Sequence, residues 1–358
     1  MKIECVTDKL EYALTRAQRV TGKNLTLPVL NYLYLEAHGR TLSIRATNLD
    51  LGIEVTIPAK VSHEGVVVVP GDVFAGFVSS LRGERSVVCE VSDGNLVVTT
   101  DGSTSTIKAH PHEDFPKIPH VEGGASLTAP AHDLTRCLKD VQYSASASTV
   151  KPELSSVFIT SPDSQLVFVA TDSFRLAERT SQIKNQNNFP DVLIPQKNVP
   201  EIIRILEEVD EEVTVLCDGN QVAFRFDGVY LTSRIIDGTF PDYKQIIPTE
   251  ATTEVVVLKE DLEHTLKTAR IFSDKLNQIV FTLDPAQKTF SVSTHNSDVG
   301  ENTNTLKATL TGEPLTITFN YTYIIDCFSS LTTDSISLSL NGSDKRVVVH
   351  PVSDSSFL

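Results

Sequence analysis

The sequence predicts an α+β fold built from three tandem copies of one domain, each with antiparallel sheets and two helices. Three kinds of pattern support this fold class, because helix-like segments, short sequence motifs and turn dipeptides recur in the same order. Their spacing is about 125 residues in a chain of 358 residues. A fixed period of this kind is the signature of a repeated structural unit.

The helix that opens each copy is the clearest repeated element. Leucines four residues apart fall on one face of a helix. Such pairs recur in all three copies as Leu10/Leu14, Leu134/Leu138 and Leu262/Leu266. We therefore expect a helix with one buried face near the start of each copy.

A second helix in each copy is predicted by segments that start at Val69, Ile194 and Phe319. Apolar residues with helical spacing follow each start, and they are Val73/Phe77, Val199/Ile203/Leu206 and Ile324/Phe328/Leu331. Between the helices, apolar and polar residues alternate with period two, which indicates half-buried strands. The alternating segments are 42–46, 49–57, 222–226, 290–292 and 336–340.

Turn segments supply the remaining repeats. Tight hairpins with positive φ are expected at Asp93-Gly94, Asp218-Gly219 and Asn341-Gly342. Residues 46–50 resemble 170–174 and, more faintly, 293–297, while residues 115–119 resemble 240–243 and 247–248. We predict domains at residues 1–122, 126–248 and 252–358, with linkers near 120–125 and 249–253.

The charge and composition exclude several classes of protein. The chain has 46 acidic and 31 basic residues and a net charge of −15, so a role on DNA would need local positive charge. No apolar run approaches the ~20 residues of a membrane span, and the start lacks the form of a signal peptide. Five scattered cysteines without a CxxC pair fit a reducing compartment. We predict a cytoplasmic protein.

Basic residues lie opposite the leucines of the first helix in all three copies. They are Arg16, Arg19, Arg136, Lys139 and Lys267, with Arg270 nearer the edge of the apolar face. Equivalent positive faces would bind phosphates without reading base sequence. For any one of these residues, an ordinary solvated helix face is the simpler interpretation.

Catalytic signatures are absent from the sequence. It contains no GxxxxGK[ST], GxSxG or HExxH, and no GxGxxG after a strand. His110, His112 and His120 could hold a metal, but a solvated loop explains them better. Asp172 and Asp242 could act as paired carboxylates in hydrolysis, but turn chemistry explains each segment. We predict a non-catalytic protein without cofactor or metal.

Three segments resemble the signature segments of a known family. They are TLPVLNYL at 26–33, ATDSFRLA at 170–177 and DGTFPDY at 237–243. These segments are similar to those of the bacterial DNA polymerase III beta subunit, the sliding clamp, and the resemblance covers essentially the whole chain. It implies a head-to-tail homodimer that closes as a ring of six clamp domains, with helices lining the hole and sheets outside. Duplex DNA would thread the hole while the ring slides.

The family resemblance also implies a set of partners. They are double-stranded DNA, the DNA polymerase III catalytic subunit and other polymerases, an ATP-driven clamp-loader complex, mismatch-repair and ligase-type proteins carrying a short clamp-binding motif, and a second copy of the chain. The chain itself would be a processivity factor, held by enclosure because each good base contact costs ~1–3 kcal/mol to break. The alternative is a three-repeat peptide-binding scaffold that does not encircle DNA.

The resemblance places a partner-peptide pocket between the second and third copies. It assigns to this pocket Lys151, Thr171, Ser173, Phe174, Arg175, Leu176, Pro241, Ile246, Arg346 and Val347. Apolar Leu176, Pro241 and Ile246 would receive hydrophobic anchors, and Arg175 would orient the peptide through hydrogen bonds. The alternatives are a structural ion pair for Arg175 and a core position for Leu176.

DNA contacts are expected at basic residues of the helices and one loop. They are Arg16, Arg19, Lys23, Arg136, Lys139, Lys197, Arg204, Lys267 and Arg270. Lys23 falls in a loop where the family places a basic contact, and Lys197 and Arg204 fall on the second helix of the second copy.

The chain departs from the family pattern in three places. Family members often have Gly-His where this chain has Ser173-Phe174, so we expect a larger and more apolar pocket rim. Gln245 stands where a basic residue is common. The family's short apolar C-terminal stretch with Met-Pro is not seen after Leu358, so either the sequence is truncated or this member lacks part of the pocket. A chain that lacks the stretch would be expected to bind partners more weakly.

Overall fold

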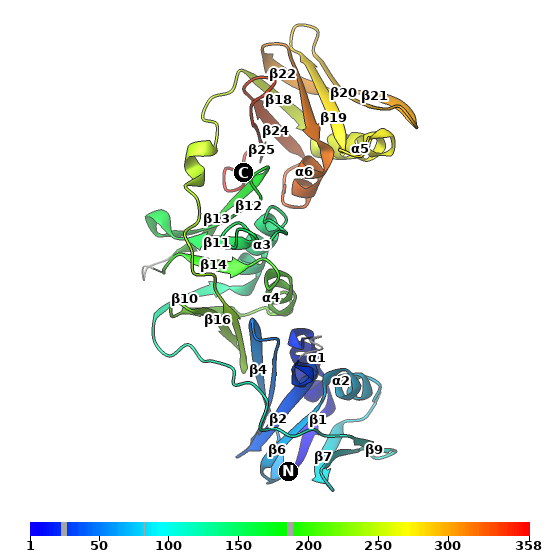
Figure 1. The fold of residues 1–358 in the computed structure, drawn as a ribbon, viewed down its shortest axis with the longest axis vertical. Helices are drawn as coiled ribbons and strands as arrows, with labels where there is room; N and C mark the ends of the chain where they lie inside the picture. The colour runs from blue at the N-terminus through cyan, green and yellow to red at the C-terminus, as the bar shows by residue number, and fades with distance from the viewer. Residues whose placement is uncertain (23–26, 82, 185–188) are drawn as a thin grey trace. The chain divides into compact units, whose positions relative to one another are not determined.

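The structure is a computed structural model that describes residues 1–22, 27–81, 83–184 and 189–358. It divides into two compact units, which are described separately here. One comprises residues 1–135 and 185–237, and the other comprises residues 136–184 and 238–358. Antiparallel strands with short helices make up both units (Figure 1). The α+β class and the two helices per copy are thereby confirmed.

The first copy places its two helices side by side against its strands (Figure 1). The helices are α1 (Thr7–Val20) and α2 (Gly71–Ser79), with a 3-10 helix η1 (Pro28–Asn31). The strands are β1 (Lys2–Val6), β2 (Tyr32–His38), β3 (Thr41–Thr47), β4 (Leu51–Pro58), β5 (Lys60–His63), β6 (Gly65–Pro70), β7 (Ser86–Ser92), β8 (Asn95–Thr99) and β9 (Thr104–Ile107). Five of them form a sheet in the order β5-β1-β7-β8-β9. The β7–β8 turn has positive φ at both Asp93 and Gly94, as predicted.

A second sheet joins the first and second copies within the first unit. The second copy contributes β10 (Ala125–Pro130), β15 (Glu212–Cys217), β16 (Gln221–Phe226) and β17 (Val229–Arg234), and also β14 (Val192–Pro195) and helix α4 (Val199–Leu206). The sheet order is β10-β15-β16-β17-β4-β3-β2-β6. At the junction, Leu231 of β17 lies opposite Ile53 of β4, and both are fully buried. Backbone hydrogen bonds therefore run without a break from one copy into the next.

The helix faces confirm one prediction and correct another. Leu10 and Leu14 of α1 are fully buried, as expected. On α2, however, Val73 is 51% exposed, while Phe74 and Val78 are the buried pair. Both pairs have the same four-residue spacing, so periodicity alone could not decide which one faces the core. The predicted Val73/Phe77 face is wrong by one residue.

The second unit contains the remaining strands and the third copy. Its helices are α5 (Lys259–Ala269), α6 (Tyr321–Ile325) and the 3-10 helices η2 (Pro162–Ser164), η3 (Tyr243–Ile246), η4 (Arg270–Phe272) and η5 (Asp326–Ser329); α3 (Ala131–Gln142) spans the boundary between units. The strands are β11 (Ser156–Thr160), β12 (Gln165–Thr171), β13 (Leu176–Lys184), β18 (Thr253–Leu258), β19 (Gln278–Asp284), β20 (Thr289–Asn296), β21 (Gly300–Leu306), β22 (Ala308–Gly312), β23 (Leu315–Asn320), β24 (Ser335–Leu340) and β25 (Val347–Pro351). Third-copy sheets have the orders β22-β18-β24-β25 and β21-β20-β19-β23, and β12 pairs with both β11 and β13.

A buried charge cluster, which the sequence analysis did not find, lies beside β13. The Arg179 side chain is buried, with Nε 3.5 Å from Asp140 Oδ2 and Nη1 3.3 Å from Asp354 Oδ2. Next to it, the backbone of Leu358 exchanges hydrogen bonds of 2.8 and 2.9 Å with Glu178. A buried charge is tolerated only when it is paired. The cluster therefore links α3, β13 and residues 354–358.

Asp140 should give the folded chain a characteristic pH dependence. Burial raises the pKa of Asp140 to about 6, against the opposing effects of Arg179 and Arg136. Between about pH 4 and pH 6 the folded carboxyl therefore binds more protons than the unfolded one. The contribution of Asp140 to the free energy of unfolding is therefore complete below the pKa of this carboxyl in the unfolded chain. It is lost as the pH rises through about 6.

The measurement compares the wild type with Asp140→Asn, which cannot titrate at this position. The difference in free energy of unfolding, wild type minus variant, should fall by about 2 kcal/mol between pH 4 and pH 8. Urea unfolding at a series of pH values provides the comparison. A difference that stays constant or rises with pH would contradict the assignment.

Candidate peptide pocket and nucleic-acid interface

The turn between β12 and β13 holds an exposed phenylalanine in a fixed position. Thr171 Oγ1 donates a hydrogen bond to the Arg175 carbonyl (2.7 Å) and accepts one from the Ser173 N–H (3.2 Å). Asp172 Oδ1 accepts the N–H groups of Phe174 and Arg175, at 2.9 Å each. These bonds hold Ser173 at φ +79°, in the left-handed region. As a result, the Phe174 residue is presented 79% exposed.

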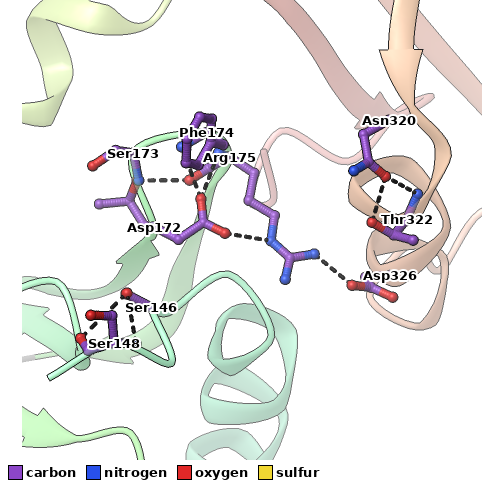
Figure 2. Close-up of polar contacts among 10 residues, drawn as sticks. Ser146, Ser148, Asp172, Ser173, Phe174, Arg175, Asn320, Thr322 and Asp326 are labelled. Atoms are coloured by element: carbon purple, nitrogen blue, oxygen red, sulfur yellow. Dashed lines mark hydrogen bonds and ion pairs between the residues drawn. The ribbon is translucent and has the colours of Figure 1, made fainter. Parts of the chain in front are cut away.

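Arg175 joins this turn to the third copy. Its Nε lies 3.2 Å from Asp172 Oδ2, and its Nη1 lies 2.5 Å from Asp326 Oδ2 in η5. Figure 2 shows the guanidinium between the two carboxylates. The same group lies 5.5 Å from the ring centroid of Tyr143 and 5.2 Å from that of Tyr323, within cation–π range. Arg175 therefore forms the structural ion pairs that were the alternative to a peptide contact. Its contact with a peptide stays a prediction.

An aromatic pair from two copies lies beside this ion pair. The Phe174 ring stacks on Tyr323 of α6, with centroids 6.2 Å apart and planes 20° apart. Asn320 Oδ1 caps α6 by accepting the backbone N–H and the hydroxyl of Thr322 (Figure 2). Tyr323 was not among the predicted pocket residues, because the sequence marks residues 319–323 only as a repeat. Its contact with Phe174 extends the apolar surface that a ligand would meet.

The segment that contains Pro241 and Ile246 contacts strands of the second copy through two aromatic residues. Phe240 stacks on Phe158 of β11 with a centroid distance of 4.7 Å. Burial, together with the nearby Glu178 carboxylate on β13, raises the pKa of Tyr243. Leu176, two residues before Glu178, points to the same face of the strand and is only half-buried. Leu176 therefore lies outside the fully buried core, on the face of β13 that η3 approaches.

The remaining predicted pocket residues lie on several different elements. Lys151 is exposed in the loop after α3, and Pro241 and Ile246 are exposed around η3. Val347 is the first residue of β25, which pairs with β24, and Arg346 directly precedes it. In the described structure no hydrogen bond or ion pair joins Lys151, Arg346 or Val347 to the Thr171–Leu176 turn. Their membership of the pocket stays a prediction.

Residues considered for catalysis or metal binding have other partners. Asp172 is bound to its own turn and to Arg175, and Asp242 accepts a 2.6 Å hydrogen bond from Gln245 Nε2. His110 packs on Tyr32, and His120 stacks on Tyr230 at 4.3 Å. Among the residues with a described position, no group of three or more His, Cys, Asp or Glu could bind a metal. All five cysteines are buried and none forms a disulfide, and no helix in the described ranges is long and apolar enough for a membrane span.

Arg16 does not lie on an exposed helix face, and that prediction is wrong. The residue is 3% exposed. Its guanidinium lies 3.4 Å from the ring centroid of Tyr12, and Nη2 lies 2.7 Å from Glu208 Oε2. Arg19 Nη1 also lies 2.7 Å from Glu208. Glu208 follows α4, which packs against α1, and this packing covers a face that an isolated helix would expose.

The other predicted DNA-contact residues that the structure describes are exposed, and several form ion pairs. Arg136, Lys139, Lys197, Arg204, Lys267 and Arg270 are exposed, whereas Lys23 lies outside the described residues. Ion pairs join Arg136 to Asp140 at 3.8 Å, Lys197 to Asp50 at 2.5 Å, Arg204 to Glu201 at 2.6 Å and Lys267 to Glu263 at 2.6 Å. Exposed ion pairs are worth only about 0–1 kcal/mol, so these cations can exchange an acid for a phosphate at little cost.

Models of one protein family match all three copies. The DNA polymerase III beta subunit N-terminal domain matches residues 1–119, its central domain matches residues 128–242, and its C-terminal domain matches residues 244–358. The beta sliding clamp of Synechococcus elongatus is 28% identical over 363 residues, covering 98% of this chain and 96% of the relative. The beta sliding clamp of Staphylococcus epidermidis is 24% identical and covers 92% and 90%.

Solved structures share the fold over almost the full length. The DNA polymerase III beta subunit of Thermotoga maritima superposes with a TM-score of 0.93 at 27% identity, covering 99% of this chain and 97% of that one. The subunit from Pseudomonas aeruginosa has a TM-score of 0.95 at 23% identity and covers 100% and 98%. With three family domains in order along the chain, this protein belongs to the DNA polymerase III beta subunit family, that of the beta sliding clamps.

Proposed function

We propose that two copies of this chain close head to tail into a ring that encircles duplex DNA and slides along it without sequence specificity. The observation that carries the proposal is the three-fold repetition of one clamp domain, because two such chains supply six similar domains. A heterologous contact whose rotation closes produces a ring rather than a filament. The names of the relatives and their shared fold support the same role, which is non-catalytic and belongs to DNA replication in the cytoplasm.

An apolar patch on the third copy supports self-association. Ile271 and Leu276 are each 66% exposed, and Val299 is 58% exposed. The segment around η4 is tied to β20, because the carbonyls of Phe272 and Ser273 accept hydrogen bonds from Thr294 and Asn296 side chains. Exposed apolar groups that lie together mark a protein contact. We propose that a second copy of the chain covers this patch, which is named the η4 patch below.

Sparse phosphate contacts would accompany enclosure. The exposed cations on α3, α4 and α5 and in their flanking segments are the proposed contacts: Arg136, Lys139, Lys197, Arg204, Lys267 and Arg270. Successive phosphates along the duplex are equivalent, so a side chain can exchange one phosphate for the next at little net cost in free energy as the ring slides. The net charge of −15 limits adhesion elsewhere on the surface.

The proposed role as a sliding ring is tested by comparing how well the protein stays on circular DNA and on linearised DNA. The chain would be loaded on nicked circular DNA with the clamp loader and ATP, and the circle would then be linearised. Protein held by enclosure should remain on the circle in high salt and leave the linear product over its ends. Equal retention on both forms, or a mass of 39.2 kDa in solution rather than twice that value, would favour the scaffold alternative.

The surface around Phe174 is proposed to dock short segments of partner proteins. Phe174, Leu176, Pro241 and Ile246 would receive apolar anchors, with Arg175 behind them as a bridge between copies. The class of partner is the replicative polymerase, and the clamp loader and the mismatch-repair and ligase-type proteins would use the same surface. Exposed aromatic side chains are frequent hot spots in such contacts.

Phe174→Ala should weaken this docking about tenfold, because loss of an aromatic anchor costs about 1.4 kcal/mol or more. The measurement is fluorescence anisotropy with a labelled peptide from the clamp-binding segment of the polymerase catalytic subunit. Val73→Ala, at a strongly exposed site in the first copy, is the matched control and should bind normally. Unchanged affinity in Phe174→Ala would remove this residue from the pocket.

A further inference from the structure

A cavity of about 530 Å³ lies at the junction of the first and second copies, within the first unit. Its wall is formed by the turn between β3 and β4 on one side and by the end of β17 on the other. The lining includes Leu49, Leu51, Pro119, Arg234, Ile235 and Asp237. Cavities of this size are typical of binding sites for small molecules and short peptides.

The turn that lines the cavity repeats the Phe174 turn bond for bond. Thr47 Oγ1 donates to the Leu51 carbonyl (2.9 Å) and accepts the Leu49 N–H (2.9 Å), as Thr171 does for its own turn. Asn48 Oδ1 accepts the N–H groups of Asp50 and Leu51 at 3.0 and 2.8 Å, as Asp172 does. Leu49 has φ +78°, against +79° at Ser173. Two non-glycine residues are thus held in the same unfavourable conformation at equivalent positions.

The third copy does not repeat this turn. Thr294, at the equivalent position, donates instead to the carbonyls of Phe272 and Gln278. Residues 293–297 have no positive φ. The strained turn therefore occurs in the two copies that are followed by another copy in the chain. This distribution associates the turn with a junction between copies rather than with the domain fold itself.

The chemistry of the cavity suits a peptide. Leu49, 44% exposed, and half-buried Ile235 offer apolar contact. Arg234 and Asp237 are exposed and form no ion pair within the described ranges, so they offer one set of donors and one of acceptors. The carboxylate of Asp50 is already paired with Lys197 at 2.5 Å. A peptide backbone supplies the complementary carbonyl and amide groups, and an aliphatic side chain fits the apolar wall.

The rim of the cavity is held in place by backbone bonds. The Arg234 N–H donates to the Asp50 carbonyl (2.8 Å), and the Ile235 N–H donates to the Asn220 carbonyl (3.0 Å). The two sides of the cavity are therefore connected directly, and ligand binding would require little reorganisation. Such preorganisation reduces the entropic cost of binding.

We propose that this cavity is a second docking site on each chain for an extended peptide segment with an aliphatic anchor. The anchor contacts Leu49 and Ile235, while its backbone bonds to Arg234 and Asp237. The inference rests on the proposed function of the equivalent turn around Phe174 as a peptide pocket. A single partner that carries two such segments could then occupy both sites of one chain.

The test is calorimetric titration of the full chain with the labelled polymerase peptide described above, over a wide concentration range. Leu49→Asn removes the apolar side chain but tolerates the left-handed backbone, so the turn should fold. Leu258→Asn, at an exposed leucine of β18, is the matched control. Phe174→Ala combined with Ile246→Ala disables the pocket around Phe174.

The expected result is two sites per wild-type chain and per Leu258→Asn chain, and one site in either disabled protein. The chain with all three substitutions should bind none. The second site would be overturned if the wild type has one site, and if that site is lost in Phe174→Ala/Ile246→Ala but unchanged in Leu49→Asn. The proposed function would then remain intact. One site lost only in Leu49→Asn would support the cavity and refute the Phe174 pocket, and absence of binding would refute both.

Discussion

Replacing Arg179 with methionine should lower the free energy of unfolding by about 3–5 kcal/mol at pH 8, the cost of breaking a buried ion pair from one side. At this pH Asp140, whose pKa burial raises to about 6, is charged. Without the guanidinium, the buried Asp140 loses its 3.5 Å partner and Asp354 loses its 3.3 Å partner. Methionine keeps most of the side-chain volume, so the effect reports charge rather than a cavity.

The same carboxylate provides the control for this experiment. Arg136 also lies near Asp140, at 3.8 Å, but its side chain is exposed to solvent. Arg136→Met should therefore lower the free energy of unfolding by no more than about 1 kcal/mol. Guanidinium unfolding of the two variants gives the comparison. If Arg179→Met and Arg136→Met lowered the free energy of unfolding equally, the burial of Arg179 would not explain how much this cluster stabilises the fold.

Introducing aspartate at both Ile271 and Leu276 should convert the proposed dimer into single chains. The two side chains are the most exposed members of the η4 patch, and a charge placed in an apolar contact must be buried without a partner. The mass in solution should fall from twice 39.2 kDa to 39.2 kDa, and retention on circular DNA should disappear. Analytical ultracentrifugation and the linearisation assay measure the two effects.

Val150→Asp places the same charge on an exposed apolar residue of the second copy and should leave the dimer intact. The circular dichroism spectrum of the double variant should match that of the wild type, because Ile271 and Leu276 contribute little to the core. If the double variant remained dimeric, the η4 patch would not be the contact between chains. If Val150→Asp also dissociated the proposed dimer, added negative charge at any exposed site would explain the result, and the η4 patch would not be identified as the contact.

The sequence predicted the repeat and the buried leucine faces because both depend on local spacing. It could not decide between Val73 and Phe74 on α2, since neighbouring apolar positions satisfy the same helical period. It also placed Arg16 in solvent, because nothing near Arg16 in the sequence announces that Glu208 and α4 will cover it. Long-range packing, rather than local propensity, decided both outcomes.

The candidate site was predictable to a similar degree. The turn around Phe174 is encoded by Thr171 and Asp172, whose side chains bond to backbone groups within four residues, so its motif could be recognised. The contacts of Arg175 with Asp326 and of Phe174 with Tyr323 join residues about 150 positions apart. No periodicity connects such positions, and the aromatic rim contributed by the third copy therefore became visible only in the folded chain.

The shared sheet of the first and second copies bears on how the proposed ring could open. From Val229↔Val55 to Ser233↔Leu51, β17 and β4 are paired in unbroken register. Bending at this seam would require several backbone hydrogen bonds to rupture together, and no small dihedral adjustment could replace them. Residues 1–135 and 185–237 should therefore move as one rigid body. A clamp loader that opens the proposed ring would have to do so by deformation outside this shared sheet.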